Sequence, residues 1–430
     1  MKIQIISPGV YTYGSMVLGG ILRDRGHSVD ISKDLRRDGD VIILSLFSTL
    51  QLLDPSIREF VSKAESPVYC GGPVGICPEM VLGELDVDAV AMGEGESIIA
   101  MLVENGPEGI PGVAYRKDGK IIRSEPSGVD VIDHAMPLFP SDLPAQSVRG
   151  ANVYIETHRG CLGGCTFCQV PRFFGRNIRS RSLENIVAEV RELKRMGVKR
   201  VAVSGGTASL FGYRNSLNKD AFISMLRELS VILGKRNLSV PDMRVDLVDD
   251  EILEAIRECT IGWLFFGFES GSDRMLKLMR KGVTVRDNMR AVELARSHGV
   301  KVGGSFIVGY PGESREDFEQ TLDFMEEAML DDVFVSIAEP IPGTPLARVA
   351  LDTPSEDNPL FCEHSGAFRA LKISEAEARC FEMMLHGESC KPVPRAISEA
   401  LYSTYLNEAR SQGEDIRKVY GLLNKYSEFV

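Results

Sequence analysis

The feature of this sequence that most constrains its fold is the regular alternation of short apolar, strand-like segments with longer amphipathic, helix-like ones. One block of this alternation covers residues 1–103, and a second block of roughly six strand–helix units covers residues 152–343. Strands that are separated by helices usually pair in parallel, because each helix carries the chain back across the sheet. The alternation therefore predicts an α/β protein with two mostly parallel sheets.

The sequence between the two blocks breaks this rhythm. Residues 112–125 predict a short hairpin that turns at Asp118 and Gly119, and a proline-containing stretch follows. The first block predicts a doubly wound, Rossmann-like domain, and the second predicts a partial (β/α)6 barrel whose site lies at the carboxyl ends of its strands. We expect an N-terminal domain over 1–135, a connector over 136–148, the barrel over 149–349 and a small helical domain over 350–430.

Composition and charge narrow the class of partner. Hydrophobic residues make up 44% of the chain and charged residues 26%, which is typical of a folded soluble protein. The formal net charge of -12 argues against nucleic acid as a partner, because phosphate binding depends on clustered Lys and Arg. The sequence shows neither a signal peptide nor an apolar run long enough to cross a membrane, so we expect a cytoplasmic protein.

Three of the nine cysteines lie within eight positions, directly after the first predicted strand of the barrel. These are Cys161, Cys165 and Cys168. Soft thiolate ligands select iron–sulfur clusters or zinc. A cubane cluster normally takes four cysteines, so three would leave one iron open to another ligand. A zinc site completed by His158 is the alternative.

The segment HRGCLGGCTFC resembles the CxxxCxxC loop of radical S-adenosylmethionine (SAM) enzymes. The resemblance implies that Cys161, Cys165 and Cys168 hold a catalytic [4Fe-4S] cluster. In that family an electron from an external donor passes through the cluster and cleaves SAM, which yields methionine and a 5′-deoxyadenosyl radical.

Four later segments carry the same resemblance, in the order in which the family has them: SGGT at 204–207, GFESGSDRMLKLMRKG at 267–282, SFIVGYPGES at 305–314 and EPIPGTPL at 339–346. Thr207 stands where the family usually has an acidic residue. The resemblance implies that SAM is held by Gly205, Gly206, Thr207, Glu269, Ser305 and Gly309.

The first block resembles the cobalamin-binding domain that precedes many radical SAM domains. Three segments carry this resemblance: VIILSLFSTL at 41–50, YCGGPVGICPE at 69–79 and VDAVAMGEGE at 87–96. No Asp-x-His-x-x-Gly signature is present, and we interpret His27 as structural, so the cobalt would lack a histidine ligand. A flavodoxin-like domain without a corrinoid is the alternative. The residues implied to contact cobalamin are Tyr11, Thr12, Ser45, Phe47, Ser48, Gly71, Gly72, Pro73, Gly93 and Glu94.

Together the two modules resemble a cobalamin-dependent radical SAM methyltransferase, in which a substrate carbon radical collects a methyl group. The module order and the helical tail resemble those of the C-methyltransferases that modify a glutamine of methyl-coenzyme M reductase in methanogens. This implies a post-translational modification, with the alpha subunit of that reductase as the protein partner.

Several alternatives stay open. The same modules would serve a cyclisation or rearrangement, and a protein that only carries a cluster would keep the cysteine loop. A methylthiotransferase fits less well, because it needs three further cysteines in the first domain and a basic tRNA-binding domain, whereas only Cys70 and Cys77 are present. We interpret Cys362, Cys380 and Cys390 as incidental thiols, with an auxiliary cluster as the alternative.

Overall fold

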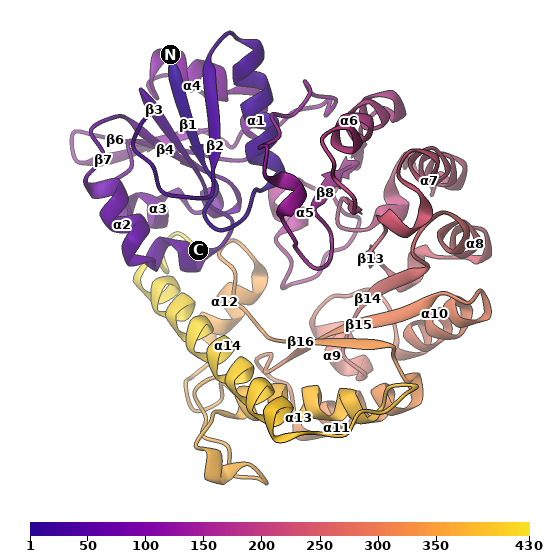
Figure 1. The fold of residues 1–430 in the computed structure, drawn as a ribbon. Helices are drawn as coiled ribbons and strands as arrows, with labels where there is room; N and C mark the ends of the chain where they lie inside the picture. The colour runs from indigo at the N-terminus through magenta and orange to yellow at the C-terminus, as the bar shows by residue number, and fades with distance from the viewer.

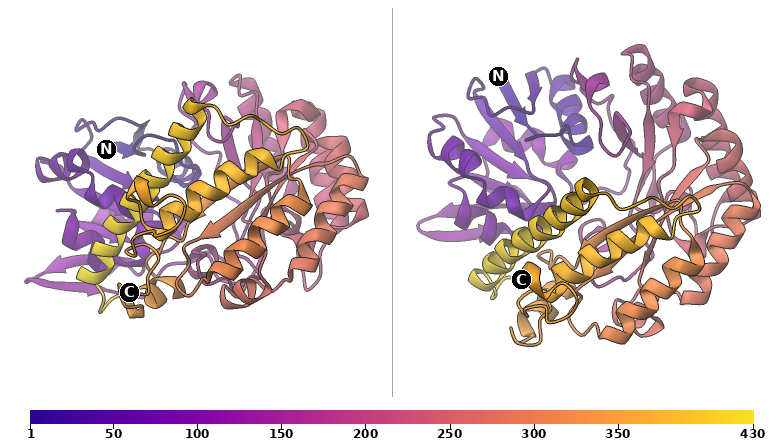
Figure 2. Two further views of the ribbon diagram at one scale, coloured as in Figure 1. Left: turned by 90° about the horizontal axis from the view of Figure 1, so that it is seen from below. Right: turned by 60° about the horizontal axis from the view of Figure 1, so that its bottom comes forward.

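The computed structural model describes all residues from 1 to 430 (Figure 1). An N-terminal α/β domain lies beside an open, curved barrel wall, and the last helix of the chain crosses between the two (Figures 1 and 2). This arrangement confirms the predicted fold class. No helix combines the length and the apolar character that crossing a membrane requires.

The N-terminal sheet has seven strands in the order β2-β1-β3-β4-β5-β6-β7. The first five strands are parallel, and β6 and β7 add an antiparallel hairpin at one edge. The predicted turn is confirmed, since Asp118 and Gly119 both have positive φ, at 50° and 74°. The strands are β1 (Lys2–Ile6), β2 (Ser28–Ser32), β3 (Val41–Ser45), β4 (Val68–Gly71), β5 (Ala89–Ala91), β6 (Val113–Lys117) and β7 (Lys120–Arg123).

Both faces of this sheet are buried, as a doubly wound domain requires. Along β3, Ile43 belongs to one hydrophobic cluster, whereas Ile42 and Leu44 belong to another, because successive side chains point to opposite faces. Helices cover both faces, and α2 begins where Asp54 accepts hydrogen bonds from two backbone amides. The helices are α1 (Tyr13–Asp24), α2 (Pro55–Ser62), α3 (Pro78–Glu84) and α4 (Ile99–Asn105), with short 3-10 turns η1 (Thr49–Leu53) and η2 (Pro73–Ile76) after β3 and β4.

The barrel wall consists of two parallel sheets, in the orders β12-β11-β8 and β13-β14-β15-β16. Only two residues separate β12 from β13, so the two sheets continue one another. The strands are β8 (Val153–Glu156), β11 (Val201–Ser204), β12 (Leu238–Ser239), β13 (Asp242–Met243), β14 (Trp263–Glu269), β15 (Lys301–Val308) and β16 (Asp332–Ile337), and a short antiparallel pair, β9 (His158–Arg159) and β10 (Arg179–Ser180), flanks the cysteine loop.

Helices cover the outside of this wall, and their starts are encoded locally. Side chains of Ser182, Asn218, Asp249, Thr284 and Ser314 cap five of them, and the last two form capping boxes with acids three residues on. The capped helices are α6 (Leu183–Arg195), α7 (Lys219–Leu233), α8 (Asp250–Cys259), α10 (Val285–Ser297) and α11 (Arg315–Ala328), and the short helices α5 (Val170–Phe173) and α9 (Asp273–Leu278) follow the cysteine loop and β14.

The C-terminal segment is helical, as predicted, but it is not a separate layer. Helix α12 (Pro345–Asp352) runs across the predicted border between 349 and 350, and α13 (Glu375–Ser389) packs on β16. The 27-residue α14 (Glu399–Lys425) then returns to the N-terminal domain (Figure 2), where Leu422 and Leu423 enter the core that contains α2. The helix therefore connects the two ends of the molecule.

Candidate functional site

The cysteine loop offers a cradle for a cluster. A Cβ atom on Gly163 would lie 3.4 Å from the Sγ of Cys161 and 3.7 Å from the Sγ of Cys165, so these two thiols face the same small space. Three thiols on one short loop suit a [4Fe-4S] cluster in which one iron stays open to another ligand.

Both halves of the molecule hold this loop in place. The amide of Thr166 donates to the carbonyl of Met279 (2.9 Å), and the Thr166 hydroxyl lies 2.8 Å from the hydroxyl of Tyr310. On the other side, Nε2 of Gln169 donates to the carbonyl of Pro73 in the N-terminal domain (3.0 Å). The cluster loop is therefore fixed between the two domains.

Positive charge lies beside the loop. Burial raises the pKa of Cys165 and raises that of Cys168 to about 11, and the charge of Lys281 counteracts the rise in both. Arg244 lies close as well, with one guanidinium nitrogen 3.1 Å from the Cβ position of Gly163. Sequence reasoning missed both cations, because neither belongs to the cysteine motif and only the fold brings them there.

Glu269, an expected SAM ligand, ends β14 at an irregularity in the pairing with β15 and has a positive φ of 67°. Its Oε1 accepts a hydrogen bond from Nζ of Lys281 at 2.6 Å, and both side chains are buried. The carboxylate is thus engaged by an ammonium group of the chain itself. Glu269 also lines a cavity inside the barrel. Its role in SAM binding stays a prediction.

The predicted glycine turn follows β11 and lies beside the cluster loop. A Cβ atom on Gly206 would lie 3.6 Å from Val170, which directly follows that loop in α5, and Thr207 is buried. A Cβ atom on Gly205 would lie 2.3 Å from the ring of His158. The alternative of His158 as a zinc ligand is therefore disfavoured: this ring is buried under the turn, its Nδ1 lies 3.1 Å from the Thr157 hydroxyl, and burial lowers its pKa to about 4.

The two predicted residues on β15 and just after it have different surroundings. Ser305 lines the barrel cavity together with Glu269. Gly309 packs against α13 instead, since a Cβ atom there would lie 2.6 Å from Cβ of Ala376, and its amide donates to Glu313 (2.8 Å). The structure brings Ser305 to the site and turns Gly309 towards the C-terminal helices.

The barrel encloses a cavity of about 540 Å³. Phe167 of the cluster loop lines it, together with side chains from β14, β15 and β16. The N-terminal domain contributes Leu50, the connector contributes Arg149, and α14 closes the remaining side. The cavity thus adjoins the cluster loop and is bounded by all parts of the chain, which is where a substrate of an open α/β barrel binds.

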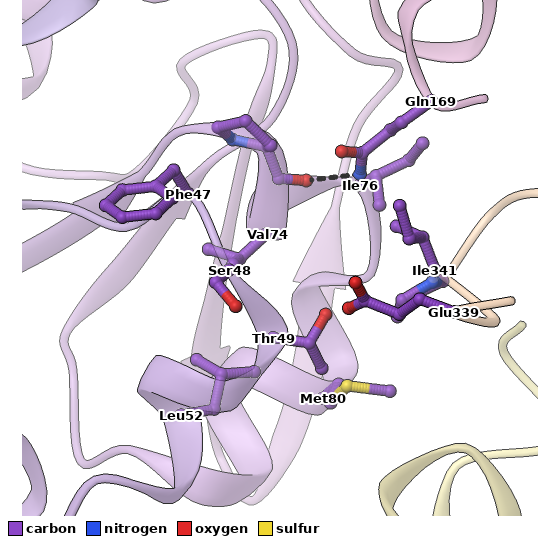
Figure 3. A pocket seen from close by; sticks show the side chains of 12 residues that line it. Phe47, Ser48, Thr49, Leu52, Val74, Ile76, Met80, Gln169, Glu339 and Ile341 are labelled. Carbon is purple, nitrogen blue, oxygen red and sulfur yellow. Dashed lines mark hydrogen bonds between the residues drawn. The ribbon is translucent and has the colours of Figure 1, made fainter. Parts of the chain in front are cut away.

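A second cavity, of about 240 Å³, lies between the N-terminal domain and the barrel (Figure 3). Of the residues expected at cobalamin, Phe47, Ser48 and Pro73 line it, and Gln169 and Glu339 face them from the barrel side. Phe47 is 45% exposed, so part of its apolar surface is open at this cavity.

The remaining residues expected at cobalamin divide into two groups, and the first consists of Thr12, Ser45, Gly71 and Gly72. Thr12 and Ser45 lie near each other at the strand ends, with their hydroxyls 3.0 Å apart. Gly71 packs on Ala91, and Gly72, with a φ of 99°, turns the chain against the carbonyl of Leu46.

The second group, Tyr11, Gly93 and Glu94, does not line the cavity beside Phe47. The Tyr11 hydroxyl donates to Asp142 (2.7 Å) beside a different, polar hollow. Gly93 lines a cavity of about 560 Å³ on the other side of η2. Glu94 is buried in ion pairs with Arg159 (2.8 Å) and Arg179 (2.5 Å), so its carboxylate joins the two domains.

The other six cysteines are free thiols, and four of them are buried. Burial raises the pKa of Cys70 to about 12 and that of Cys77 to about 11. Cys380 is buried inside α13, and Cys390 lies 3.2 Å from Nε2 of His386. The interpretation of Cys362, Cys380 and Cys390 as incidental thiols stays a prediction. His27 pairs with Glu104 (3.3 Å), and its structural role also stays a prediction.

Comparison with known proteins gives three findings. The profile of the radical SAM superfamily matches residues 155–325. A protein of Methanocaldococcus jannaschii with the provisional name of a methylthiotransferase is 51% identical over 100% of this chain and 97% of its own length. A tRNA-2-methylthio-N(6)-dimethylallyladenosine synthase of Alkalilimnicola ehrlichii is 31% identical over 78% of this chain and 74% of its own.

Among solved structures, the radical SAM methyltransferase TsrM from Kitasatospora setae, with cobalamin and a [4Fe-4S] cluster bound, matches with a TM-score of 0.68 at 17% identity, over 97% of this chain and 98% of its own. The cobalamin-dependent radical SAM enzyme OxsB matches with a TM-score of 0.63 at 15% identity, over 97% of this chain and 56% of its own. At this level of identity the likeness shows a shared fold.

These findings correct the expectation about the reaction. The predicted identity, a cobalamin-dependent C-methyltransferase for a glutamine of methyl-coenzyme M reductase, is wrong, because the relative that matches along the whole chain carries the name of a methylthiotransferase. The expectation that a methylthiotransferase fits this sequence less well is wrong for the same reason. The cofactors implied by the family are a [4Fe-4S] cluster and SAM. The chain belongs to the radical SAM superfamily and is a radical SAM enzyme.

Proposed function

We propose that this enzyme transfers a methylthio group to a substrate bound in the barrel cavity. The observation that carries the proposal is the 51% identity, along the whole chain, to a protein with the provisional name of a methylthiotransferase. The relative from A. ehrlichii, whose name describes a methylthio product, supports it.

The residues around the cavity fit the tasks that such an enzyme has. When bound, a [4Fe-4S] cluster supplies the electron for the reductive cleavage of SAM. Thr166 and Tyr310 hold the loop of its ligands, and the turn at Gly205 and Gly206 lies beside it. Phe306 and Ile337 bring apolar surface to the cavity wall.

We also infer that a corrinoid binds between the N-terminal domain and the barrel. The doubly wound sheet points the carboxyl ends of β3 and β4 at the cavity lined by Phe47 and Pro73, which is where open α/β sheets bind ligands. The fold likeness to proteins solved with cobalamin supports the inference. The half-exposed Phe47 ring suits an apolar macrocycle.

The cysteines restrict where the sulfur comes from. The N-terminal domain contains only Cys70 and Cys77, both buried and both with raised pKa, so it lacks three thiolates for a second cluster. The proposed reaction therefore draws its sulfur from a donor outside this domain. That the substrate is a protein, and that an external donor delivers the electron, stay predictions.

A double-label experiment tests the proposal. The full chain, reconstituted without oxygen, is incubated with a reductant, SAM with a deuterated methyl group, ³⁴S-sulfide and an extract of cells that lack this gene. A product that carries both labels is the expected result. A product with the deuterated methyl group and no added sulfur contradicts methylthio transfer. Cobalamin extracted from protein purified without oxygen tests the corrinoid, and its absence under cobalamin supply would overturn that part.

A further inference from the structure

We propose that the substrate carries a positive charge, an ammonium or guanidinium group, and that Glu339 together with the carboxylates of α14 binds it inside the barrel cavity. This rests on the proposed function in one respect only, namely that the barrel cavity is the substrate site. It does not depend on which group is transferred.

The charges that line the cavity are mostly negative. Five acidic residues line it, and the carboxylate of one of them, Glu269, is neutralised by Lys281. The other four are Asp242, Glu339, Glu408 and Asp415. Arg149 is the one cationic side chain in the lining, and Lys418 pairs with Asp415 from outside it (3.1 Å). The cavity therefore retains excess negative charge, which attracts cations and repels phosphates.

Glu339 has no partner of its own. It lies two residues after the end of β16 and is half-buried. No hydrogen bond or opposite charge stabilises its carboxylate. Burial and the neighbouring Asp415 both raise its pKa. A carboxylate that is partly removed from water without a counterion is unfavourable, and a bound cation would relieve this cost.

The position of Glu339 connects the two cavities. It lines the barrel cavity and also the cavity beside Phe47, and Figure 3 shows its carboxylate on the barrel side of the latter. Ile341 borders both cavities as well. A charged group bound by Glu339 would therefore place the substrate at the boundary between the barrel and the N-terminal domain.

Aromatic rings supply an independent observation that points to a cation. Phe334 of β16 is 47% exposed and lines the cavity, as do Phe265 and Phe167. The guanidinium of Arg149 lies 5.8 Å from the centre of the Phe334 ring, and its charge lowers the pKa of Asp242 against the effect of burial. The chain's own guanidinium thus already occupies an aromatic and acidic setting of the kind that recognises organic cations.

Helix α14, which forms one wall of the cavity, is hydrogen-bonded to β16 of the barrel. Oε1 of Gln412 accepts a hydrogen bond from the amide of Ile337 (3.0 Å), and its Nε2 donates to the carbonyl of Val335 (3.2 Å). Glu408 precedes Gln412 by four residues and Asp415 follows by three, so all three side chains share one helix face. The two acids consequently face the cavity from a fixed position, which suits a role in specificity.

Calorimetry with small probes tests the proposal. The reconstituted full chain with SAM bound is titrated without oxygen with N-acetyl-arginine amide and N-acetyl-lysine amide, and with the corresponding glutamine and glutamate amides. At least one cationic probe is expected to bind, with an affinity about tenfold or more above the neutral and anionic probes. Equal or tighter binding of the glutamine or glutamate probe overturns the proposal, as does no binding by either cation.

Variants assign the effect to these residues. Glu339→Gln and Asp415→Asn are each expected to weaken binding of the cationic probe about tenfold. Glu414→Gln is the matched control, because Glu414 pairs with the same Lys418 but is exposed and outside the cavity. Thermal melting confirms that each variant folds, and Glu408→Gln serves if Asp415→Asn does not.

Unchanged affinity in both cavity variants that fold contradicts the proposal. The calorimetric result is independent of the labelled product, so a failure of methylthio transfer and a failure of cation binding are told apart.

Discussion

Lys281 and Glu269 form a buried ion pair at 2.6 Å, although 12 residues separate them in the sequence. Glu269 ends β14 in a left-handed backbone conformation, and Lys281 follows α9. The pair lies close enough to the cluster loop for Lys281 to oppose the rise in the pKa of Cys165. One contact thus joins the predicted SAM residue to the surroundings of the cluster.

Breaking this pair from one side is expected to destabilise the fold. Glu269→Gln leaves the Lys281 ammonium buried without a counterion, which should lower the free energy of unfolding by about 3 kcal/mol. The double variant Glu269→Gln and Lys281→Met removes the uncompensated charge and should recover most of the loss. Urea denaturation followed by circular dichroism measures both. A double variant less stable than the single one would contradict this account of the pair.

Removal of the cysteine loop thiols is expected to abolish all iron–sulfur absorption. The triple variant Cys161→Ala, Cys165→Ala and Cys168→Ala retains Cys362, Cys380 and Cys390, of which Cys380 is buried inside α13. Because Cys380 lies inside α13 and Cys390 at its C-terminal cap, about 15 Å further along the helix axis, these two thiols cannot share one cluster, and no residual cluster is expected. Iron analysis and the visible spectrum of protein reconstituted without oxygen measure this. Iron–sulfur absorption that persists in the variant would reveal a second cluster.

The sequence predicted those parts of the fold that depend on local pattern. The alternation of strands and helices, the turn at Asp118 and Gly119 and the cysteine loop are all encoded by neighbouring residues, and each is found in the structure. The role of Glu94 was not predictable in this way, because its partners Arg159 and Arg179 lie in another domain.

The path of α14 escaped prediction for a similar reason. Its amphipathic pattern predicts a helix but does not state which surface the apolar face covers. The structure places Leu422 and Leu423 on the N-terminal core and Asp415 at the barrel cavity. The position of Asp415 at the cavity therefore depends on the contact between the end of α14 and the N-terminal domain. A local sequence pattern does not specify a contact between such distant parts of the chain.

A side chain at Gly205 is expected to disturb the turn beside the cluster loop. In Gly205→Ala the new Cβ atom would lie 2.3 Å from the ring of His158, which is buried and cannot move aside freely. The turn must shift, and SAM binding should weaken about tenfold or more. Equilibrium dialysis of SAM with the reconstituted protein measures this. Gly128→Ala, where no atom lies within 4 Å, is the control. Equal affinity in the two variants would show that the turn takes no part in SAM binding.

His158 is expected to make the fold sensitive to acid. Burial lowers its pKa from 6.5 to about 4 in the folded chain. Between these two values the unfolded chain binds a proton that the folded chain does not, so stability is full above pH 6.5 and falls as the pH drops towards 4. In His158→Gln the dependence on pH in this window should weaken by up to one proton, about 1.4 kcal/mol per pH unit. Urea denaturation at pH 7, 6 and 5 compares the two proteins, and parallel curves would exclude this role of His158.

The far end of α14 is expected to control the barrel cavity through its contact with α3. Glu84 accepts hydrogen bonds from Lys425 (2.6 Å) and from the hydroxyl of Tyr426 (2.9 Å). A Cβ atom on Gly83 would lie 2.0 Å from that hydroxyl oxygen, so Gly83→Val should push the end of the helix away from the N-terminal domain. Hydrogen exchange is then expected to accelerate over the last turns of α14, while α13 stays protected. Gly421→Ala, on α14 itself and with no atom within 4 Å, should not accelerate exchange, because alanine favours the helix. Because Asp415 lies on the same helix, the Gly83→Val variant should also bind cationic probes more weakly. Unaltered exchange in this variant would mean that the helix is held by its apolar face alone.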